Sequence, residues 1–384
     1  MTDLDPALPA EATLVGRIWR PGLGASVATV RDGMVLDVTA AFPTVADLLR
    51  EAEPARALAA ADAEPVGALA DVVAVSGWDQ REAGLTHLLA PADLQPIKAA
   101  GVTFVASLLE RVIEEQAGGD PARADAARRE MTELIGSDLA AIRPGSAEAN
   151  TLKSTLQARN LWSAYLEVGI GPDAEIFTKA PAMAAVGSGA RIGVHRASSW
   201  NNPEPEVVLA IAADGRIVGA TLGNDVNLRD VEGRSALLLG RAKDNNGACA
   251  LGPFVRLFDD DYGLDQLRRT VVHLEVKGVD GFTMSGRSSM AAISRDPSDL
   301  AAQALNASHQ YPDGVFLMCG TMFAPVDDRG EPGMGFTHHH GDVVVIAADD
   351  LGRLVNCVGR ADEIPPWTYG LRDLFGDLAR RGCA

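Results

Sequence analysis

The chain has 384 residues, 47% of them hydrophobic and 22% charged, which is typical of a globular protein and sufficient for two domains. Its formal net charge of −18 argues against nucleic acid and anionic membranes as partners, whereas a small anionic substrate needs only a local positive site. The four cysteines form no C-x-x-C pair, the acidic N-terminus lacks the features of a signal peptide, and no apolar run approaches ~18 residues. These features predict a cytoplasmic protein with reduced thiols and no membrane span.

Residues 1–89 are predicted to form a small α+β N-terminal domain that carries no visible chemistry. Asp32-Gly33 is a hairpin signal, because both central positions of a tight two-residue turn need φ > 0. It separates the strand-like runs Ser26–Val30 and Met34–Val38. Thr44 is expected to cap a short helix.

Residues 90–164 are predicted to be a helical segment that carries lid or acid–base residues. From Val102 to Gln116 apolar residues recur with helical spacing, and polar residues fill the other face. Helical signals continue from Asp120 to Trp162, with a break at the Pro-Gly pair that follows Arg143. Such an insert is expected to cover the mouth of a barrel or to build a subunit interface.

Residues 165–384 are predicted to be a β-rich metal-binding domain. Its strands are short and separated by Gly, Pro and Asp, as in Val271–Val276, Gly314–Met318 and Asp342–Ala347. Many short strands without βα alternation favour a β-roll or barrel. Tyr369–Arg381 is expected to be an amphipathic terminal helix, so that the fold class is mixed α/β and mainly β.

Two strands of this domain are predicted to form a hairpin. Val207–Ile211 and Arg216–Leu222 are rich in β-branched residues, and Asp214-Gly215 stands between them. If these two residues are the whole turn and no bulge intervenes, Ala213 faces Arg216 and the pairing continues outward in that register.

Three carboxylates meet in this register. Glu204 lies opposite Asp225, and Glu206 shares their face of the sheet because side chains alternate with period 2. Like charges at this spacing are unfavourable unless a cation lies among them. Three carboxylate oxygens without Cys or His suit a hard divalent cation, Mg²⁺ or Mn²⁺. The alternative is that Glu204 and Glu206 line a solvated strand face and Asp225 is a turn residue.

These motifs resemble the fumarylacetoacetate hydrolase family, whose E-x-E strand and N-D-x-x-x-R-D turn hold a divalent metal. Here the motifs are Glu204 to Glu206 and Asn224 to Asp230, and the resemblance extends over most of residues 90–358. It implies a fumarylacetoacetate-hydrolase-like fold in which Glu204, Glu206 and Asp225 are the metal ligands. It also implies further site residues, namely Lys243 beside the metal, Lys179 as a second cation, and Arg229 and Thr321 near the substrate.

Three of these further residues have an ordinary alternative. Lys243 can be a solvated loop cation, and Thr321 a structural hydroxyl. Arg229 either pairs with a substrate carboxylate, orients the Asp ligand, or forms an ion pair with Asp230 or Glu232.

The segment Gly101–Glu110 corresponds to the family's G-x-N-Y-x-x-H-x-x-E motif with one departure. Ser107 replaces the His that, together with the Glu three residues later, activates water in the C–C hydrolases, whereas Glu110 is kept on the same helix face. This departure and the helical insert resemble the family's sugar-acid dehydratase branch. The resemblance implies conversion of a 2-keto-3-deoxy-pentonate, derived from D-xylonate or L-arabinonate, to 2-oxoglutarate semialdehyde and water. It implies a homo-oligomer, a dimer or tetramer.

In that reaction Glu110 is the candidate acid for the leaving C4 hydroxyl, and whether Lys243, Glu110 or a water removes the C3 proton stays open. A solvated helix-surface residue is the alternative for Glu110. The alternative activity is C–C hydrolysis of an acylpyruvate or a 2,4-diketo acid, which predicts a base such as His195, His309 or His338 beside Glu110. A metal-stabilised scaffold without activity is a third hypothesis. The adjacent histidines at 338–340 are interpreted as loop residues rather than metal ligands.

Overall fold

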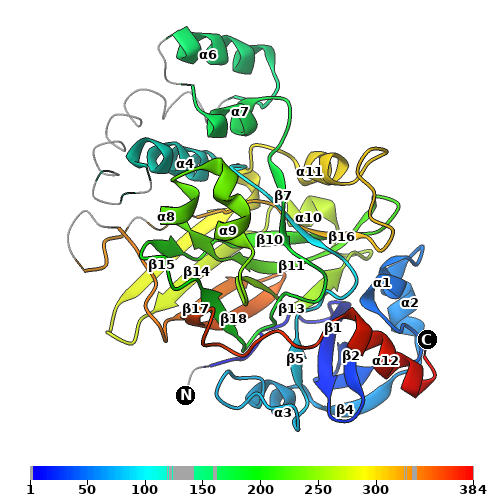
Figure 1. The fold of residues 1–384 in the computed structure, drawn as a ribbon. Coiled ribbons are helices and arrows are strands. Elements are labelled where there is room, and N and C mark those ends of the chain that lie inside the picture. Colours follow the sequence, from blue (N-terminus) through cyan, green and yellow to red (C-terminus); the bar gives the residue numbers. More distant parts are fainter. Residues whose placement is uncertain are drawn as a thin grey trace.

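The structure, a computed structural model, describes residues 3–118, 120, 123, 142–158, 162–323, 325, 327–330 and 335–383. In this part of the chain it is a mixed α/β fold, mainly β, as predicted (Figure 1). Its strands form one large sheet, a second smaller sheet and a two-stranded ribbon. None of the helices in these ranges has the length and apolarity that a membrane crossing requires.

The large sheet has eleven strands in the order β4-β3-β2-β1-β13-β11-β10-β16-β6-β7, and β5 also pairs with β1. Neighbouring strands are antiparallel except for β16 and β6. The strand bounds are β1 Leu14–Arg20, β2 Gly24–Arg31, β3 Met34–Asp37, β4 Glu64–Ala68, β5 His87–Leu89, β6 Ile97–Ala100, β7 Ile176–Ala180, β10 Pro205–Ile211, β11 Ile217–Asp225, β13 Cys249–Leu257 and β16 Val315–Met318.

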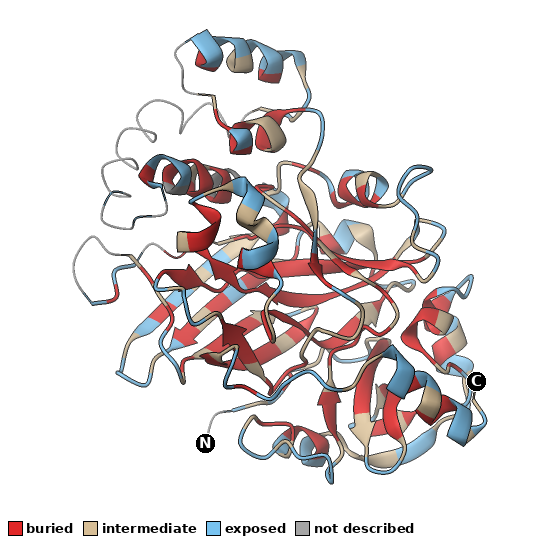
Figure 2. Ribbon diagram, in the orientation of Figure 1, coloured by how far each residue is buried: buried red, intermediate tan, exposed pale blue. Residues whose placement is uncertain are grey.

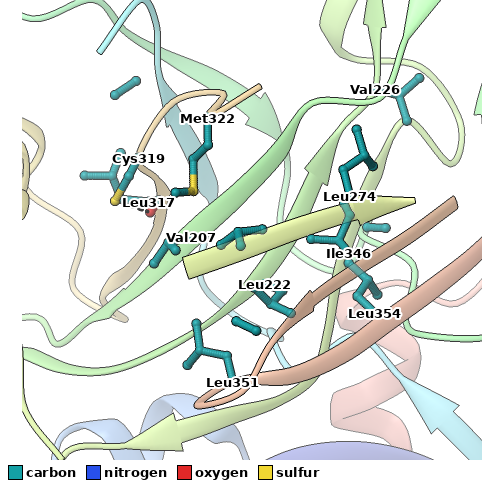
Figure 3. Packing of buried hydrophobic residues seen from close by; sticks show 14 of the residues in the cluster. Val207, Leu222, Val226, Leu274, Leu317, Cys319, Met322, Ile346, Leu351 and Leu354 are labelled. Atoms are coloured by element: carbon teal, nitrogen blue, oxygen red, sulfur yellow. Dashed lines mark hydrogen bonds between the residues drawn. The ribbon is translucent and has the colours of Figure 1, made fainter. Parts of the chain in front are cut away.

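The second sheet has five strands in the order β15-β14-β17-β18-β8, and β12 pairs with β9 in the ribbon. Their bounds are β8 Arg191–Val194, β9 Asn201–Asn202, β12 Asn227–Leu228, β14 Val271–Lys277, β15 Thr283–Ser289, β17 Val343–Ala348 and β18 Gly352–Arg360. The large core between the sheets contains apolar side chains from both of them, including Val207, Leu222, Leu274 and Ile346 (Figure 3). This packing buries β10 along its whole length.

The helices are mostly short and lie around the sheets (Figure 1). Their bounds are α1 Val45–Leu49, α2 Pro54–Ala60, α3 Leu69–Ala74, α4 Val105–Ala117, α6 Ala147–Ala158, α7 Ala164–Ile170, α8 Arg229–Glu232, α9 Leu239–Lys243, α10 Leu264–Leu267, α11 Pro297–Ala304 and α12 Leu371–Arg381. Figure 2 shows the sheets largely buried and the outer faces of the peripheral helices exposed.

Local signals in the N-terminal region are confirmed. Arg31 pairs with Met34 across Asp32-Gly33, and both turn residues have positive φ, +49° and +71°. Thr44 begins α1 with a capping box, in which its side chain accepts from the backbone of Asp47. The Ala-rich stretch after residue 55 contains β4, a strand that sequence analysis did not predict and that extends the large sheet.

The central hairpin has the predicted register at its open end and a different turn. Pro205 pairs with Asn224 and Ala210 with Gly219, as the two-residue turn requires. At the closed end, however, Ile211 pairs with Ile217, and the amide of Ala212 donates to the carbonyl of Arg216. The turn therefore has one residue more than expected, and a bulge in β11 compensates for it. The assumption of a two-residue turn without a bulge is therefore wrong. The longer turn and the bulge shift the register in opposite directions, so the strands are paired as predicted where the carboxylates lie.

The helical segment is described in part. Helix α4 and the break after Arg143 agree with the sequence, whereas most of the signals between residues 120 and 141 fall outside the described residues. The three domain boundaries stay predictions. Strand β1 of the N-terminal region pairs directly with β13, so that the large sheet runs through both regions.

Candidate active site

Glu204, Glu206 and Asp225 converge at the open end of the central hairpin. One carboxylate oxygen of each lies within 4.8 Å of the others, and the three residues are at most 2% exposed. The backbone fixes the pairing, since the amide of Asp225 donates to the carbonyl of Glu204 over 3.0 Å. The amide of Glu204 donates to the side-chain oxygen of Asn224 over 3.1 Å. The alternative of a solvated strand face is therefore wrong.

Two lysines bind these carboxylates from neighbouring elements. The Nζ of Lys243, at the end of α9, lies 2.5 Å from Oε2 of Glu204 and 3.1 Å from Oδ2 of Asp225. The Nζ of Lys179, on β7, lies 2.7 Å from Oδ1 of Asp225. Both lysines are buried, so the alternative of a solvated loop cation is wrong for Lys243.

Arg111 is a third cation at the cluster, and sequence analysis missed it. Its Nη2 donates to Oε1 of Glu204, and its Nη1 lies 3.2 Å from Oε2 of Glu232. Neither residue was predicted to belong to the site, and both are buried. Helical spacing assigns residue 111 to the polar face of α4, and no sequence signal distinguishes a solvated polar face from one packed on a buried site.

The electrostatics of the cluster follow from this arrangement of charges. Burial, together with the charges of Asp225 and Glu204, raises the pKa of Glu206 well above its usual range, although the amide of Gly320 donates to it over 2.6 Å. Burial also acts to raise the pKa of Asp225, but Lys179 and Lys243 outweigh it and lower that pKa. Burial acts to lower the pKa of Lys243, but the charges of Asp225 and Glu204 outweigh burial and raise this pKa. Lys243 is therefore an ammonium ion at neutral pH.

The three carboxylates fit a small divalent cation. Oxygen ligands of Mg²⁺ lie about 2.1 Å from the ion, so opposite ligands are about 4.2 Å apart. The oxygens here all lie within 4.8 Å of one another, close to this spacing. Repulsion among three buried carboxylates is expected at a site that binds a positive ion. Glu204, Glu206 and Asp225 are therefore suited to hold Mg²⁺ or Mn²⁺.

Glu110 and Ser107 lie on the buried face of α4. An oxygen of Glu110 is 3.0 Å from Nη2 of Arg229, whose guanidinium lies over the ring of Trp200 at 4.4 Å. Glu110 is 8% exposed, so the helix-surface alternative is wrong. The hydroxyl of Ser107 donates to the carbonyl of Phe104 over 2.8 Å. Two adjacent residues of α4, Glu110 and Arg111, thus join this helix to the hairpin region.

Glu175 is a second carboxyl group that sequence analysis did not select. It is half-buried just before β7, and burial raises its pKa while Arg111 and Lys243 act to lower it. The charges of Glu204 and Asp225 also act to raise the pKa of Glu175, so this carboxyl group interacts electrostatically with the cluster. Gly101 leaves room for this carboxyl, since a Cβ there would lie 1.8 Å from Oε2 of Glu175. The sequence shows that Glu175 precedes the strand of Lys179, but it does not show that Glu175 lies near the acidic cluster.

The resemblance places Thr321 near the substrate, but it is the neighbouring Gly320 that contacts the metal-binding cluster. The Gly320 amide reaches Glu206, whereas the Thr321 hydroxyl donates to the carbonyl of Phe323 over 3.0 Å. Thr321 is itself buried.

The three candidate histidines have other neighbours. His338 is buried with Nδ1 at 3.5 Å from Asp342, and it lies in a loop as expected. Nδ1 of His195 accepts from the amide of Ala197 over 3.1 Å. His309 is exposed beside Asn306. These contacts give the alternative hydrolase activity no support.

Comparisons with known proteins place the chain in a family. The model of the fumarylacetoacetate (FAA) hydrolase C-terminal family matches residues 158–359. The chain is 30% identical over 193 residues to 2-dehydro-3-deoxy-D-arabinonate dehydratase of Saccharolobus solfataricus, a match that spans 50% of this chain and 60% of the relative's length. It is 26% identical over 331 residues to a probable 2-keto-3-deoxyxylonate dehydratase of Haloferax volcanii, covering 85% of this chain and 93% of that protein.

Solved structures agree with the fold. A 2-keto-3-deoxy-D-arabinonate dehydratase complexed with magnesium and 2,5-dioxopentanoate superposes with a TM-score of 0.62 at 19% identity, covering 90% of this chain and 99% of that one. This likeness concerns the fold and confirms the expected fumarylacetoacetate-hydrolase-like architecture. The family model covers more than half of the chain, and the chain belongs to the fumarylacetoacetate hydrolase family.

Proposed function

We propose that this protein is a metal-dependent hydro-lyase that converts a 2-keto-3-deoxy-pentonate to 2-oxoglutarate semialdehyde, also called 2,5-dioxopentanoate, and water. The observation that carries the proposal is the buried Glu204–Glu206–Asp225 cluster, with Lys243 beside it and Ser107 in place of a water-activating histidine. The names of the two dehydratase relatives support the same reaction class. When bound to the three carboxylates, Mg²⁺ or Mn²⁺ supplies Lewis acidity toward the carboxylate and keto oxygens of a 2-keto acid.

Lys243 is proposed to stabilise the negative charge that develops on the substrate when C3 loses its proton. Its ammonium group is buried and already held by Glu204 and Asp225, so that it needs little reorganisation during the reaction. An ammonium with a raised pKa is a poor base. This favours a carboxylate or a water as the group that removes the C3 proton.

Glu110 and Glu175 are the proposed acid–base residues. Departure of the C4 hydroxyl as water needs a proton, and the later loss of a C5 proton with tautomerisation gives the aldehyde. Glu175, with its raised pKa, holds a proton more readily than an ordinary carboxyl group does. Glu110 approaches the same region from α4, where Arg229 orients it.

The remaining residues are proposed to position the substrate and the cluster. Arg229 is available to a substrate carboxylate if Glu110 shares or releases it. Lys179 has no exposed surface, and its contact with Asp225 supports a role in holding that ligand. Ser107 and Thr321 donate to backbone carbonyls, which supports roles in holding the local backbone. The small keto acid is the proposed partner, whereas a cytoplasmic location and a dimeric or tetrameric assembly stay predictions.

The test is incubation with Mg²⁺ and each C4 epimer of 2-keto-3-deoxy-pentonate, with the semialdehyde detected by a coupled aldehyde dehydrogenase. We expect product with one or both epimers, loss of product with EDTA, and recovery when Mg²⁺ is added back. An acylpyruvate serves as the control substrate for C–C hydrolysis. Cleavage of the acylpyruvate without turnover of either epimer would replace the dehydratase by the hydrolase.

Glu175→Gln is expected to lower kcat by about 10²–10⁴, the usual contribution of general acid–base catalysis, with little change in the melting temperature. A general acid is active while protonated, so activity of the native enzyme falls as pH rises through the pKa of Glu175, and the variant lacks this limb of its pH profile. Gly101→Ala, which pushes the same carboxyl away, should reproduce part of the loss. A variant with normal kcat and an unchanged pH profile would remove Glu175 from the mechanism.

A further inference from the structure

A pocket lies apart from the acidic cluster, where the N-terminal strands meet the C-terminal strap, the segment 361–370 between β18 and α12. Its volume is about 400 Å³, and none of the residues of the acidic cluster lines it. In Figure 1 the strap runs past β5 and β1 toward α12. The proposed dehydration uses no residue of this pocket.

Aromatic rings form much of the wall. The pocket is lined by Trp19, Trp78 and Trp367, three of the chain's five tryptophans, and by Tyr369. The ring of Trp19 meets that of Tyr369 edge-on, with centroids 5.2 Å apart. The indole N–H groups of Trp19 and Trp367 donate to the carbonyls of Ala83 and Tyr369 over 2.7 and 2.8 Å. Because the protein satisfies these donors, the rings offer apolar surface for stacking.

Two guanidinium groups of the wall have backbone carbonyls as partners in place of carboxylates. Arg17, on β1, donates to the carbonyl of Ala92 over 2.6 Å, and Arg81 donates to the carbonyl of Leu88. Within the described ranges neither forms an ion pair, and burial lowers the pKa of Arg81 to about 10 with no carboxylate opposing it. Asp93 is the acidic group that acts on Arg17 from a distance, and it accepts from the amide of Val45.

Arg17 is buried and Arg81 is half-buried, and their hydrogen bonds to backbone carbonyls neutralise neither charge, so a negative group bound at the pocket would be favourable for both. A third arginine at the pocket, Arg191, shows the contrast, because it lies 2.8 Å from the carboxylate of Asp79. The one acidic residue among those lining the pocket is Glu82, which is exposed and forms no ion pair with Arg17 or Arg81. The volume falls within the range of about 300–1,000 Å³ typical of small-molecule sites.

We propose that this pocket binds a small organic anion that carries a planar ring, with the anionic group at Arg17 and Arg81 and the ring against the tryptophans. A nucleoside monophosphate and an aromatic carboxylate share this chemistry. Each combines a group that guanidinium binds through paired hydrogen bonds with a flat face that stacks on indole.

The test measures quenching of tryptophan fluorescence and heat of binding in the full chain with four probes. AMP and 1-naphthoate carry both features, adenosine lacks the anion, and inorganic phosphate lacks the ring. We expect AMP or 1-naphthoate to bind at least about 10-fold more tightly than adenosine or phosphate, since each missing feature removes more than about 1.4 kcal/mol. Preference between the two full probes identifies a phosphate or a carboxylate ligand.

Two variants and two controls locate the binding. Arg81→Gln removes the charge, and Trp367→Ala removes a ring that is 50% exposed, so that its loss should cost little stability. Each variant should bind the preferred probe about 10-fold more weakly than the native protein does. Trp162→Phe, in the helical segment outside the pocket, and Glu206→Gln should leave it unchanged. If neither full probe binds, or if both pocket variants bind it normally, the proposal is wrong and the arginines serve only their backbone carbonyls.

Discussion

Glu206→Gln is expected to reduce dehydratase activity by at least about 100-fold while the protein remains folded. Changes in the surroundings of a metal ligand alone typically cost 10–100-fold in affinity or activity, and loss of a ligand should cost more. Burial and the like charges of Asp225 and Glu204 raise the pKa of Glu206, so a neutral amide at this position relieves both costs in the metal-free protein. The amide oxygen can still accept from Gly320.

The measurement for this variant is the melting temperature with and without Mg²⁺, beside the activity. The native protein should gain about 2.7 kcal/mol of stability when Mg²⁺ is present at 100 times its dissociation constant, and Glu206→Gln should lose most of this gain. Asp214→Asn, at the other end of the same hairpin, is the matched control, because its ion pair with Arg216 is exposed. A variant that keeps its activity, or that unfolds without Mg²⁺ as a scaffold residue would, contradicts the proposed role.

Lys243→Met is the second change with a large expected effect, and it acts on both stability and turnover. The free energy of unfolding is expected to fall by about 3–5 kcal/mol, the usual cost of removing one partner of a buried ion pair. The reason is that Glu204 and Asp225 lose a compensating charge. Added Mg²⁺ supplies positive charge to the same oxygens, so it should restore much of the stability. It should not restore activity, which is expected to fall by at least about 100-fold, in the range of a lost transition-state charge contact.

Chemical denaturation at several Mg²⁺ concentrations separates these two effects. Lys98→Met on the neighbouring strand β6 is the control, since its Nζ donates to the Thr178 hydroxyl over 2.8 Å and lies at the surface. Full activity of Lys243→Met at saturating Mg²⁺ would limit Lys243 to balancing charge in the metal-free protein.

The sequence was sufficient for those parts of the site that depend on local pairing. Alternation along two strands and a Gly-containing turn placed Glu204, Glu206 and Asp225 on one face, and the structure brings them together. Family motifs added Lys179 and Lys243, which no spacing argument could have joined to the same carboxylates, because they lie on β7 and α9.

The residues that were missed depend on tertiary packing. Arg111 and Glu232 lie on helices whose polar faces turn inward onto the cluster, and amphipathic spacing alone predicts solvent on that side. Glu175 precedes a strand, and only the folded chain shows that Gly101 leaves space for its carboxyl group. Strand β4 was missed for a similar reason, since an Ala- and Pro-containing run has low strand propensity and is recruited by the edge of β3.

The bulge in β11 determines which length changes this hairpin tolerates. Because it absorbs the extra turn residue between Ala210 and the turn, every pair from Ala210 outward keeps the alignment of a tighter hairpin. Loss of one loop residue alone should be tolerated, because a two-residue turn between Ala212 and Arg216 leaves every pair from Ala210 outward unchanged. A one-residue deletion in β10 outward of Ala210 should instead shift the register and rotate Glu204 and Glu206 away from Asp225. Relatives are therefore expected to differ in length at the closed end of this hairpin and not along its outer pairs.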